Sequence, residues 1–232
     1  MTFKPTSLDD FVFSDPSARQ ALDDIVEGHT PFPEQKRALL LSGMPGTGKS
    51  ALAQFLPQLL ETSPRYRAGI SGGLLKSGYT ETTTCTQGMR GSQVSQPILQ
   101  RARGGLYSDQ KRLRYEIIDE VDELTEQSIG TLKGLMTQRE TEDVVFILTA
   151  NDSAKFSKAL MSRCIAIPMN RASPDDLVQV GRATLRRGGL QGNELTDEEL
   201  RELAGRSQCD LRGYLTSVLT AARRSHAALT AV

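Results

Sequence analysis

Tryptophan is absent from this sequence of 232 residues, and only two histidines and three cysteines are present. His29 and His226 are interpreted as surface residues, so the sequence gives little support for histidine-based catalysis. Cys85, Cys164 and Cys209 are odd in number, widely spaced and without a zinc-ligand pattern. We therefore expect reduced thiols in a cytoplasmic protein, with neither a disulfide framework nor a zinc site.

The sequence also lacks an excess of charge and a long apolar run. Lysine plus arginine and aspartate plus glutamate each total 28, which argues against a protein that coats nucleic acid through bulk charge, although a local basic surface stays open. No apolar run approaches the ~20 residues of a membrane span, and the first ten residues have no apolar signal core. We expect no membrane partner and no export, and the length allows one or two domains.

A glycine-rich segment at residues 43–50, Gly-Met-Pro-Gly-Thr-Gly-Lys-Ser, has the spacing of a phosphate-binding loop. An apolar run at 38–41 predicts a buried strand before it, and apolar residues at helical spacing predict a helix after it. Lys49 is expected to reach the outer phosphates and Ser50 to hold Mg²⁺. The predicted nucleotide-binding residues of the loop are Gly43, Pro45, Gly46, Thr47, Gly48, Lys49, Ser50 and Ala51. The segment therefore predicts a protein that binds a nucleoside triphosphate.

A second chemical segment is an apolar strand at 115–118 that ends in Asp119 and Glu120. An apolar strand followed by Asp-Glu has the form of a Walker B motif, and the carboxyl ends of strands are where ligands bind in doubly wound sheets. Asp119 is predicted to hold Mg²⁺, directly or through water, and Glu120 to orient and deprotonate the attacking water. Asp122 and Glu123 are interpreted as surface acids without a role.

Two further polar residues have two readings each. Asn151 follows an apolar strand at 144–148 and is either a water-positioning group beside the γ-phosphate or part of an ordinary helix start, Asn-Asp-Ser. Arg163 precedes a short strand at 165–168 and is either a solvated charge or a finger offered to a neighbouring subunit's phosphate.

Two further segments each have two interpretations. Residues 64–84 predict a short strand near 66–70 and then a loop, which is either functional or simply exposed. A basic cluster is either a nucleic-acid contact or a solvated surface. The second interpretation stays open because no series of stacking aromatic residues accompanies the cluster. This cluster comprises Arg101, Arg103, Lys111, Arg112 and Arg114.

Residues 170–232 change character and predict a small all-helical domain, which divides the chain into a core at 1–169 and a lid at 170–232. Ser173 and Thr196 are placed to start helices, and Asp210 to cap the last one. Arg212 lies in the first turn of that helix, where an ordinary surface arginine is the alternative to a functional one.

Together these residues resemble the AAA+ ATPases, and within them the clamp-loader branch, over nearly the whole chain. The matching segments are the N-terminal segment at 4–11, the Walker A loop at 43–50, Walker B at 117–122, sensor 1 at Asn151, Ser-Arg-Cys at 162–164 and the Asp-Leu-Arg of sensor 2 at 210–212. The Ser-Arg-Cys and Asp-Leu-Arg motifs narrow the match beyond the broad Walker class. Cys209 replaces the glycine that precedes Asp-Leu-Arg in the family.

The resemblance implies an α/β fold, an AAA+ P-loop core with a five-stranded parallel sheet between helices, followed by the helical lid. ATP and Mg²⁺ are the implied ligands, with ATP held between core and lid. The catalytic residues implied are Glu120, with Asn151 positioning the water, Arg163 acting on the neighbour's site and Arg212 reporting the γ-phosphate to the lid.

The resemblance also implies partners: copies of the chain in a ring or arc, a pentamer or hexamer, together with DNA and a sliding clamp or another replication protein. The first expectation is an ATP-driven DNA-replication step, most like sliding-clamp loading, in a bacterial or phage-encoded protein. The alternative is an ATP-gated DNA-binding scaffold of the helicase-loader or transposition-regulator type. A weaker alternative is polypeptide threading, with segments 73–75 and 78–79 as poorly spaced pore-loop candidates.

One departure from the branch concerns the end of the sequence. Clamp-loader subunits carry a further helical collar after the lid, whereas this sequence ends at Val232. We expect either a truncated chain or a compact relative that assembles through its ATPase domains or on a partner.

Overall fold

The computed structural model describes residues 5–62, 79–104, 113–189 and 195–230. Contacts divide the chain into two units. The sheet unit comprises Ser17–Gly43 and Ser50–Pro168, and the helical unit comprises Met1–Pro16, Met44–Lys49 and Met169–Val232. The predicted domain boundary after residue 169 stays a prediction.

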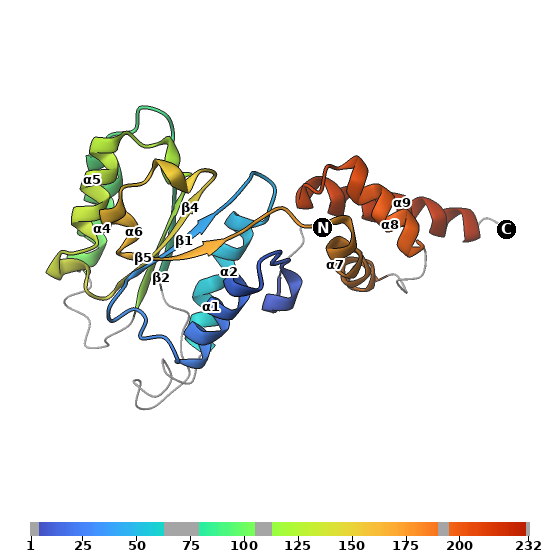
Figure 1. Cartoon of the computed structure of the whole chain (residues 1–232), viewed down its shortest axis with the longest axis horizontal. Coiled ribbons are helices and arrows are strands. Elements are labelled where there is room, and N and C mark those ends of the chain that lie inside the picture. The colour runs from blue at the N-terminus through green and yellow to red at the C-terminus, as the bar shows by residue number, and fades with distance from the viewer. Residues whose placement is uncertain (1–4, 63–78, 105–112, 190–194, 231–232) are drawn as a thin grey trace. The chain divides into compact units, whose positions relative to one another are not determined.

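The sheet unit contains a five-stranded parallel sheet in the order β2-β3-β4-β1-β5 (Figure 1). The strands are β1 (Ala38–Ser42), β2 (Tyr79–Thr84), β3 (Arg114–Asp119), β4 (Val144–Ala150) and β5 (Cys164–Pro168). The predicted five-stranded parallel sheet is therefore confirmed. Because β4 lies between β1 and β3, the strand of the glycine loop and the strand of the Asp-Glu pair are separated by one strand.

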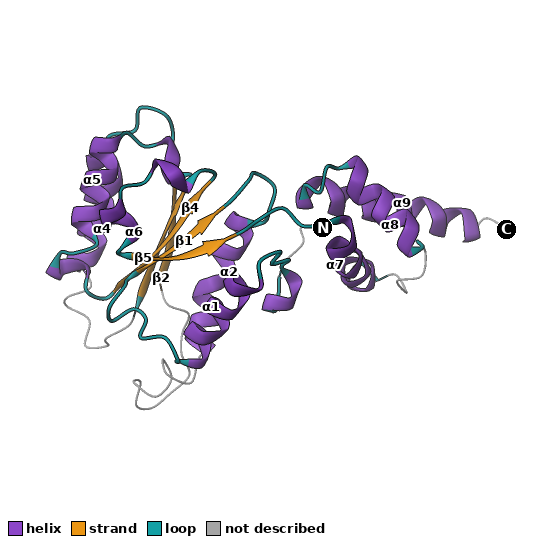
Figure 2. Ribbon diagram, in the orientation of Figure 1, coloured by secondary structure: helices purple, strands orange, loops and turns teal. Residues whose placement is uncertain are grey.

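Helices cover both faces of this sheet (Figure 2). On one face lie α1 (Pro16–Glu27) and α2 (Lys49–Thr62), and on the other lie α4 (Gly91–Gly104), α5 (Glu126–Leu135) and α6 (Lys158–Met161). Short 3₁₀ turns join the elements at Leu8–Asp10, Val121–Glu123, Arg139–Thr141 and Ser153–Lys155. The central strands are buried on both sides, which is why they read as continuous apolar runs.

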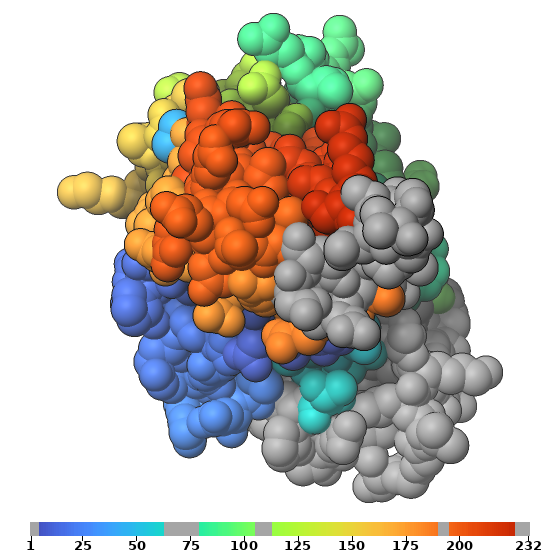
Figure 3. Space-filling view, turned by 90° about the vertical axis from the view of Figure 1, so that its right-hand side faces the viewer, coloured from blue at the N-terminus to red at the C-terminus, as the bar shows by residue number. Residues whose placement is uncertain are grey.

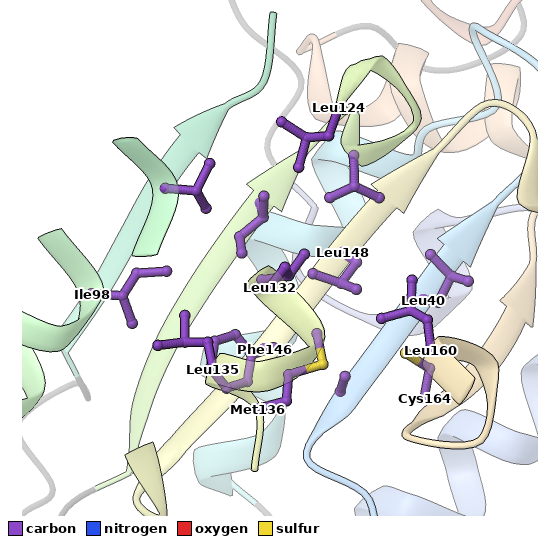
Figure 4. Packing of buried hydrophobic residues seen from close by; sticks show 14 of the residues in the cluster. Leu40, Ile98, Leu124, Leu132, Leu135, Met136, Phe146, Leu148, Leu160 and Cys164 are labelled. Atoms are coloured by element: carbon purple, nitrogen blue, oxygen red, sulfur yellow. The ribbon is translucent and has the colours of Figure 1, made fainter. Parts of the chain in front are cut away.

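The core on the α4–α6 face is formed where α5 packs on β4. Figure 4 shows Leu132 and Leu135 of α5 beside Phe146 and Leu148 of β4, with Ile98 of α4 next to them. These five side chains are at most 1% exposed, and each such burial contributes about 1.5–3 kcal/mol to folding. This packing fixes β3 and β4 as a rigid base for the residues at their ends.

The predicted loop through Thr84 is wrong for residues 79–84, which form the edge strand β2. Tyr79 pairs with Arg114 of β3 and Thr84 pairs with Asp119, in parallel register. The run of β-branched threonines suits a strand, but most of its side chains are exposed, so no apolar alternation marks it in the sequence. The strand expected at 66–70 and the pore-loop candidate at 73–75 lie outside the described residues.

The helical unit contains α7 (Pro174–Arg187), α8 (Asp197–Arg206) and α9 (Leu211–Thr230). Ser173 and Thr196 form capping boxes at the first two, as the sequence predicts. Tyr214 is fully buried among these helices and its hydroxyl donates to the Leu177 carbonyl at 2.9 Å. Figure 3 shows the atoms of these helices in orange to red. The predicted all-helical C-terminal portion is confirmed.

The start of the chain packs in the same unit through Asp10, which is 5% exposed. Its carboxylate accepts the backbone N–H groups of Thr6 at 2.6 Å and Ser7 at 3.1 Å, and it forms an ion pair with Arg187 of α7. Burial opposes the ionised form, but the Arg187 and backbone hydrogen bonds outweigh it and lower the pKa of Asp10.

None of the described helices is long and apolar enough to cross a membrane.

Candidate functional site

Three strands end together at the carboxyl edge of the sheet. Ser42 of β1 pairs with Ala150 of β4, and Ile118 of β3 pairs with Leu148 of β4. The Gly43 N–H then donates to the Ala150 carbonyl at 3.1 Å, which holds the start of the glycine loop against β4. Parallel pairing therefore brings the glycine loop, the Asp-Glu pair and the tip of β4 to one edge.

Asp119 is the centre of the polar contacts at this edge. The Ser50 hydroxyl donates to both oxygens of the Asp119 carboxylate, at 3.0 and 3.1 Å, and the Thr149 hydroxyl of β4 donates to one of them. Ser50 and Asp119 are thus confirmed as neighbours although 69 residues separate them. A hydroxyl and a carboxylate converging in this way present the oxygen ligands that Mg²⁺ prefers, so the residues fit the predicted metal.

Glu120 lies in a left-handed turn directly after β3, with φ 60° and ψ 46°. Its N–H donates to the Thr149 hydroxyl at 3.0 Å, and its side chain is exposed. Left-handed backbone costs a residue with a side chain about 1–2 kcal/mol, and such strain gathers at functional sites. Thr149 was not singled out by the sequence, yet it bonds both predicted Walker B acids. The sequence feature that could have identified Thr149 is its position directly after the apolar run of β4.

Asp122 is not a surface acid, and that prediction is wrong. The turn Val121–Glu123 folds the side chain toward β4, where Asp122 Oδ2 accepts the Asn151 N–H at 3.1 Å. Its other oxygen is buried without a hydrogen-bond partner among the described residues. Asp152, rather than Asn151, caps the turn that follows, by accepting the Ala154 N–H at 2.9 Å. Asn151 is therefore fixed at the tip of β4, beside the Walker B end.

The glycine loop itself belongs to the helical unit from Met44 to Lys49. Gly46 and Gly48 have φ of 80° and 91°, a backbone that favours glycine. Lys49 is 7% exposed, and its ammonium donates to the Met44 carbonyl at 2.8 Å, while the Thr47 hydroxyl donates to the same carbonyl at 3.0 Å. The lysine is thus held inside the loop on a carbonyl that phosphate oxygens can replace.

Within the same unit, the start of α9 contacts the glycine loop. The Leu211 N–H donates to the Gly46 carbonyl at 2.9 Å, and a Cβ on Gly46 would lie 1.7 Å from Asp210 Oδ1. Asp210 also caps α9 by accepting the Gly213 N–H at 2.7 Å. Arg212, in the first turn of α9, is exposed. The sequence predicted Asp210 as a helix cap and as the first residue of the Asp-Leu-Arg motif; its contact with a loop glycine needed the structure.

The two residues before Asp210 have left-handed backbone. Gln208 has φ 52° and Cys209 has φ 56°. Glycine adopts this backbone without the steric cost that a Cβ brings, which explains the glycine that the AAA+ pattern has at the position of Cys209. Cysteine at this position carries that cost.

Cys85 lies directly behind the Walker B residues but is not a nucleophile. Its N–H donates to the Asp119 carbonyl at 2.8 Å, and the side chain is 1% exposed. Burial, and then the charges of Asp119, Glu120 and Asp122, raise the pKa of the thiol to about 12. The thiol therefore stays protonated at neutral pH. All three cysteines are free.

Arg163 lies at the opposite, amino edge of the sheet. Cys164 of β5 pairs with Ala38 at the start of β1, so Arg163 precedes the first residue of the sheet on its strand. Five residues of β1 separate that level from the glycine loop, about 16 Å along the strand. The Arg163 Nη1 group donates to the Ala159 carbonyl of α6 at 2.6 Å. The structure thus brings together Ser50, Asp119, Glu120 and Asn151, and leaves Arg163 apart from them.

Part of the predicted basic cluster is structural. Arg101 of α4 binds the Glu116 carboxylate through two hydrogen bonds of 2.9 and 2.6 Å, and Glu116 is 2% exposed. Arg114 donates to the Arg101 carbonyl. Lys111 and Arg112 lie outside the described residues. Arg101 and Arg114 therefore no longer support the nucleic-acid interpretation of the cluster, because both form hydrogen bonds within the sheet unit.

Comparison with known proteins gives one family match and several distant relatives. Residues 39–169 match the ATPase family associated with various cellular activities (AAA). The chain is 24% identical over 192 residues to DNA polymerase III subunit gamma of Buchnera aphidicola subsp. Schizaphis graminum (strain Sg), covering 77% of this chain and 49% of the relative. It is 21% identical over 238 residues to replication factor C subunit 3 of Arabidopsis thaliana, covering 94% of this chain and 64% of the relative.

Among solved structures, the chain resembles the RuvB Holliday junction branch migration motor of Thermotoga maritima. The TM-score is 0.65 at 19% identity, covering 93% of this chain and 63% of that one. At this identity the likeness concerns the fold alone. The chain spans less than two thirds of the length of each of these three proteins.

Proposed function

The chain belongs to the AAA family of ATPases, and from that premise we propose that it hydrolyses ATP at interfaces between its own copies to drive a step of DNA replication. The coarse activity, ATP hydrolysis, is that of the family. The division of the site between copies and the replication step are the proposal.

In this proposal the loop from Gly43 to Ala51 wraps the triphosphate. Backbone N–H groups of the loop and of the α2 N-terminus face the phosphates, as such loops do. Lys49 exchanges the Met44 carbonyl for phosphate oxygens, which offer it a charge-assisted hydrogen bond. Ser50 and Asp119 would hold Mg²⁺, which would neutralise phosphate charge when bound.

Glu120 is the proposed general base. It takes a proton from a water molecule whose oxygen forms the new bond to the γ-phosphorus, while the bond to the β-phosphate oxygen breaks and ADP leaves. Thr149 fixes the Glu120 backbone through the 3.0 Å hydrogen bond. Asn151, held at the tip of β4 by Asp122, positions the water, and Arg212 on α9 senses the γ-phosphate.

The observation that carries the proposal of a shared site is the position of Arg163. It directly precedes β5 at the amino edge, whereas Asp119 ends β3 at the carboxyl edge, so one copy cannot bring this guanidinium to its own Walker B acids. A cation that stabilises charge on the transferring phosphoryl group contributes strongly to hydrolysis. We therefore assign Arg163 to the nucleotide of a neighbouring copy.

Mixing two inactive variants tests this assignment. Glu120→Gln removes the base but keeps Arg163, and Arg163→Ala keeps the base but cannot serve a neighbour. An equimolar mixture contains interfaces with both intact groups, so we expect it to hydrolyse ATP faster than either variant alone. A mixture as inactive as its parts, or an Arg163→Ala chain that hydrolyses ATP normally as a dilute monomer, would refute the shared site.

The DNA-replication step is supported by the two relatives, whose names place them in a DNA polymerase and a replication factor. Together with the Ser-Arg-Cys and Asp-Leu-Arg motifs, they favour a role most like sliding-clamp loading. The solution mass with a non-hydrolysable ATP analogue, with and without primed DNA, tests it. A discrete pentamer closed by primed DNA supports the loader role. A hexamer, or an open filament on duplex DNA, supports the DNA-binding scaffold instead, and a persistent monomer contradicts self-assembly.

A further inference from the structure

A cavity of about 370 Å³ lies at the amino edge of the sheet, away from the Walker residues. Its walls come from the segment before β1, from the connection between α5 and β4, and from Arg163. The lining residues with ionisable side chains are Glu34, Arg37, Arg139, Glu142 and Arg163. Three arginines and two glutamates therefore line the cavity, so its ionisable lining has an excess of positive charge.

The arginines of this cavity differ from others in the chain. Arg101 and Arg187 each bind a carboxylate. Within the part of the chain that the structure describes, Arg37, Arg139 and Arg163 form no ion pair with a carboxylate. Arg163 in addition has a buried Nε without a hydrogen-bond partner among the described residues. A guanidinium presents a planar fork of donors that matches phosphate oxygens, so this group of cations suits a phosphate ligand.

Arg37 is held level with Arg163 by the sheet. The pair Ala38 and Cys164 starts the β1–β5 ladder, so the residues before them, Arg37 and Arg163, lie side by side at the same edge. The Phe146 N–H donates to the Arg37 carbonyl at 2.8 Å, which fixes the backbone of Arg37. Both side chains line the one cavity.

The head group of Arg37 is held far less firmly than its backbone. Its Nη1 donates to the Thr141 carbonyl at 3.4 Å, a long hydrogen bond. Thr141 is itself fully buried, and its hydroxyl donates to the Leu135 carbonyl at 2.6 Å, so the wall behind Arg37 is rigid. A fixed backbone with a weakly held guanidinium is the arrangement of a side chain that can turn to a ligand without disturbing the fold.

We propose that Arg37 is a second catalytic arginine of the shared site: with Arg163, it contacts the phosphates of the nucleotide bound to a neighbouring copy. This inference rests on the proposed function, because it needs the neighbour's triphosphate to reach this edge. The developing charge of the transferring phosphoryl group is then met by two guanidinium groups rather than one.

The test compares Arg37→Gln with the charge-retaining Arg37→Lys and with Arg103→Gln, an exposed arginine of α4 outside the cavity. For Arg37→Gln we expect kcat to fall about tenfold or more, the loss typical of a hydrogen bond to a charged group, with KM for ATP and the melting temperature nearly unchanged. Arg37→Lys recovers part of the rate, and Arg103→Gln hydrolyses ATP like the wild type. Mixing Arg37→Gln with Glu120→Gln restores activity, because the second variant supplies an intact Arg37 to its neighbour.

Four outcomes overturn the proposal about Arg37, and only the last of them also refutes the shared site of the proposed function. Normal kcat in Arg37→Gln, while Arg163→Ala is inactive, leaves the shared site standing and removes Arg37 from it. Loss of activity that Glu120→Gln does not rescue places the effect within the variant's own chain. An Arg37→Gln chain that fails to assemble where the wild type assembles assigns Arg37 to a protein–protein contact. Normal activity in both Arg37→Gln and Arg163→Ala refutes the shared site itself.

Discussion

The two edges of one sheet differ in the kind of side chain they carry and in how firmly it is held. At the carboxyl edge, Ser50, Asp119 and Thr149 are joined by hydrogen bonds, and Glu120 is tied to Thr149 through its backbone. At the amino edge, Arg37 and Arg163 each donate to one backbone carbonyl and form no ion pair among the described residues. The acids and hydroxyls of the proposed mechanism are thus preorganised within a copy. In the same proposal, Arg37 and Arg163 find their phosphate partner only on a neighbouring copy.

The largest expected effect comes from removing the proposed general base, Glu120, at the carboxyl edge. Glu120→Gln should lower kcat for ATP hydrolysis by about 10²–10⁴-fold, because a positioned general base contributes that much, while nucleotide affinity stays close to that of the wild type. Steady-state hydrolysis and equilibrium binding of a fluorescent ATP analogue measure the two quantities. Glu123→Gln, three residues further on, is the matched control and should stay active. A Glu120→Gln enzyme with near-normal kcat would show that the base lies elsewhere.

The next effect tests whether paired and unpaired arginines differ as the structure indicates. Arg101→Met leaves Glu116 buried without its partner and should lower the free energy of unfolding by about 3–5 kcal/mol. Arg163→Met should lower it by only about 1 kcal/mol, because the substitution removes one hydrogen bond, to the Ala159 carbonyl, and breaks no ion pair with a described carboxylate. Urea unfolding of the two variants gives both values. Equal destabilisation would mean that Arg163 is a structural residue, contrary to its assigned role.

The smallest effect concerns the hydroxyl that links the Walker B acids. Thr149→Val removes a group that donates to Asp119 and accepts from the Glu120 N–H, and a lost hydrogen bond of this kind is worth about 1 kcal/mol. We expect kcat to fall roughly five- to tenfold, since about 1.4 kcal/mol is a factor of ten, with near-normal activity in Thr149→Ser. If Thr149→Val and Thr149→Ser are equally active, the link has no catalytic importance.

Much of the carboxyl edge could be predicted from the sequence, because its signals are local. The glycine loop, its flanking strand and helix, and the Asp-Glu pair after an apolar run each lie within a few residues. Their meeting follows from parallel pairing. The role of Asp122 could not be predicted in this way, because the N–H it accepts comes from Asn151, on a strand distant in sequence.

The amino edge and the sheet border were harder to predict. Arg37 looks in the sequence like an ordinary charge before a strand, and only the β1–β5 register places it beside Arg163. The edge strand β2 exposes its threonines and so lacks the apolar alternation by which strands are found. Arg101 was interpreted as part of a basic cluster because its partner, Glu116, lies on a different element, within the largely apolar strand β3.

The central claim is that hydrolysis needs two copies of the chain, and the rate per chain as a function of protein concentration tests it most directly. At saturating ATP, the account predicts a turnover per chain that is very low in dilute solution, rises with concentration as copies associate, and then levels off. Arg163→Ala should stay low throughout. A turnover per chain that is the same at every concentration, down to where the solution mass is that of a monomer, would contradict the account.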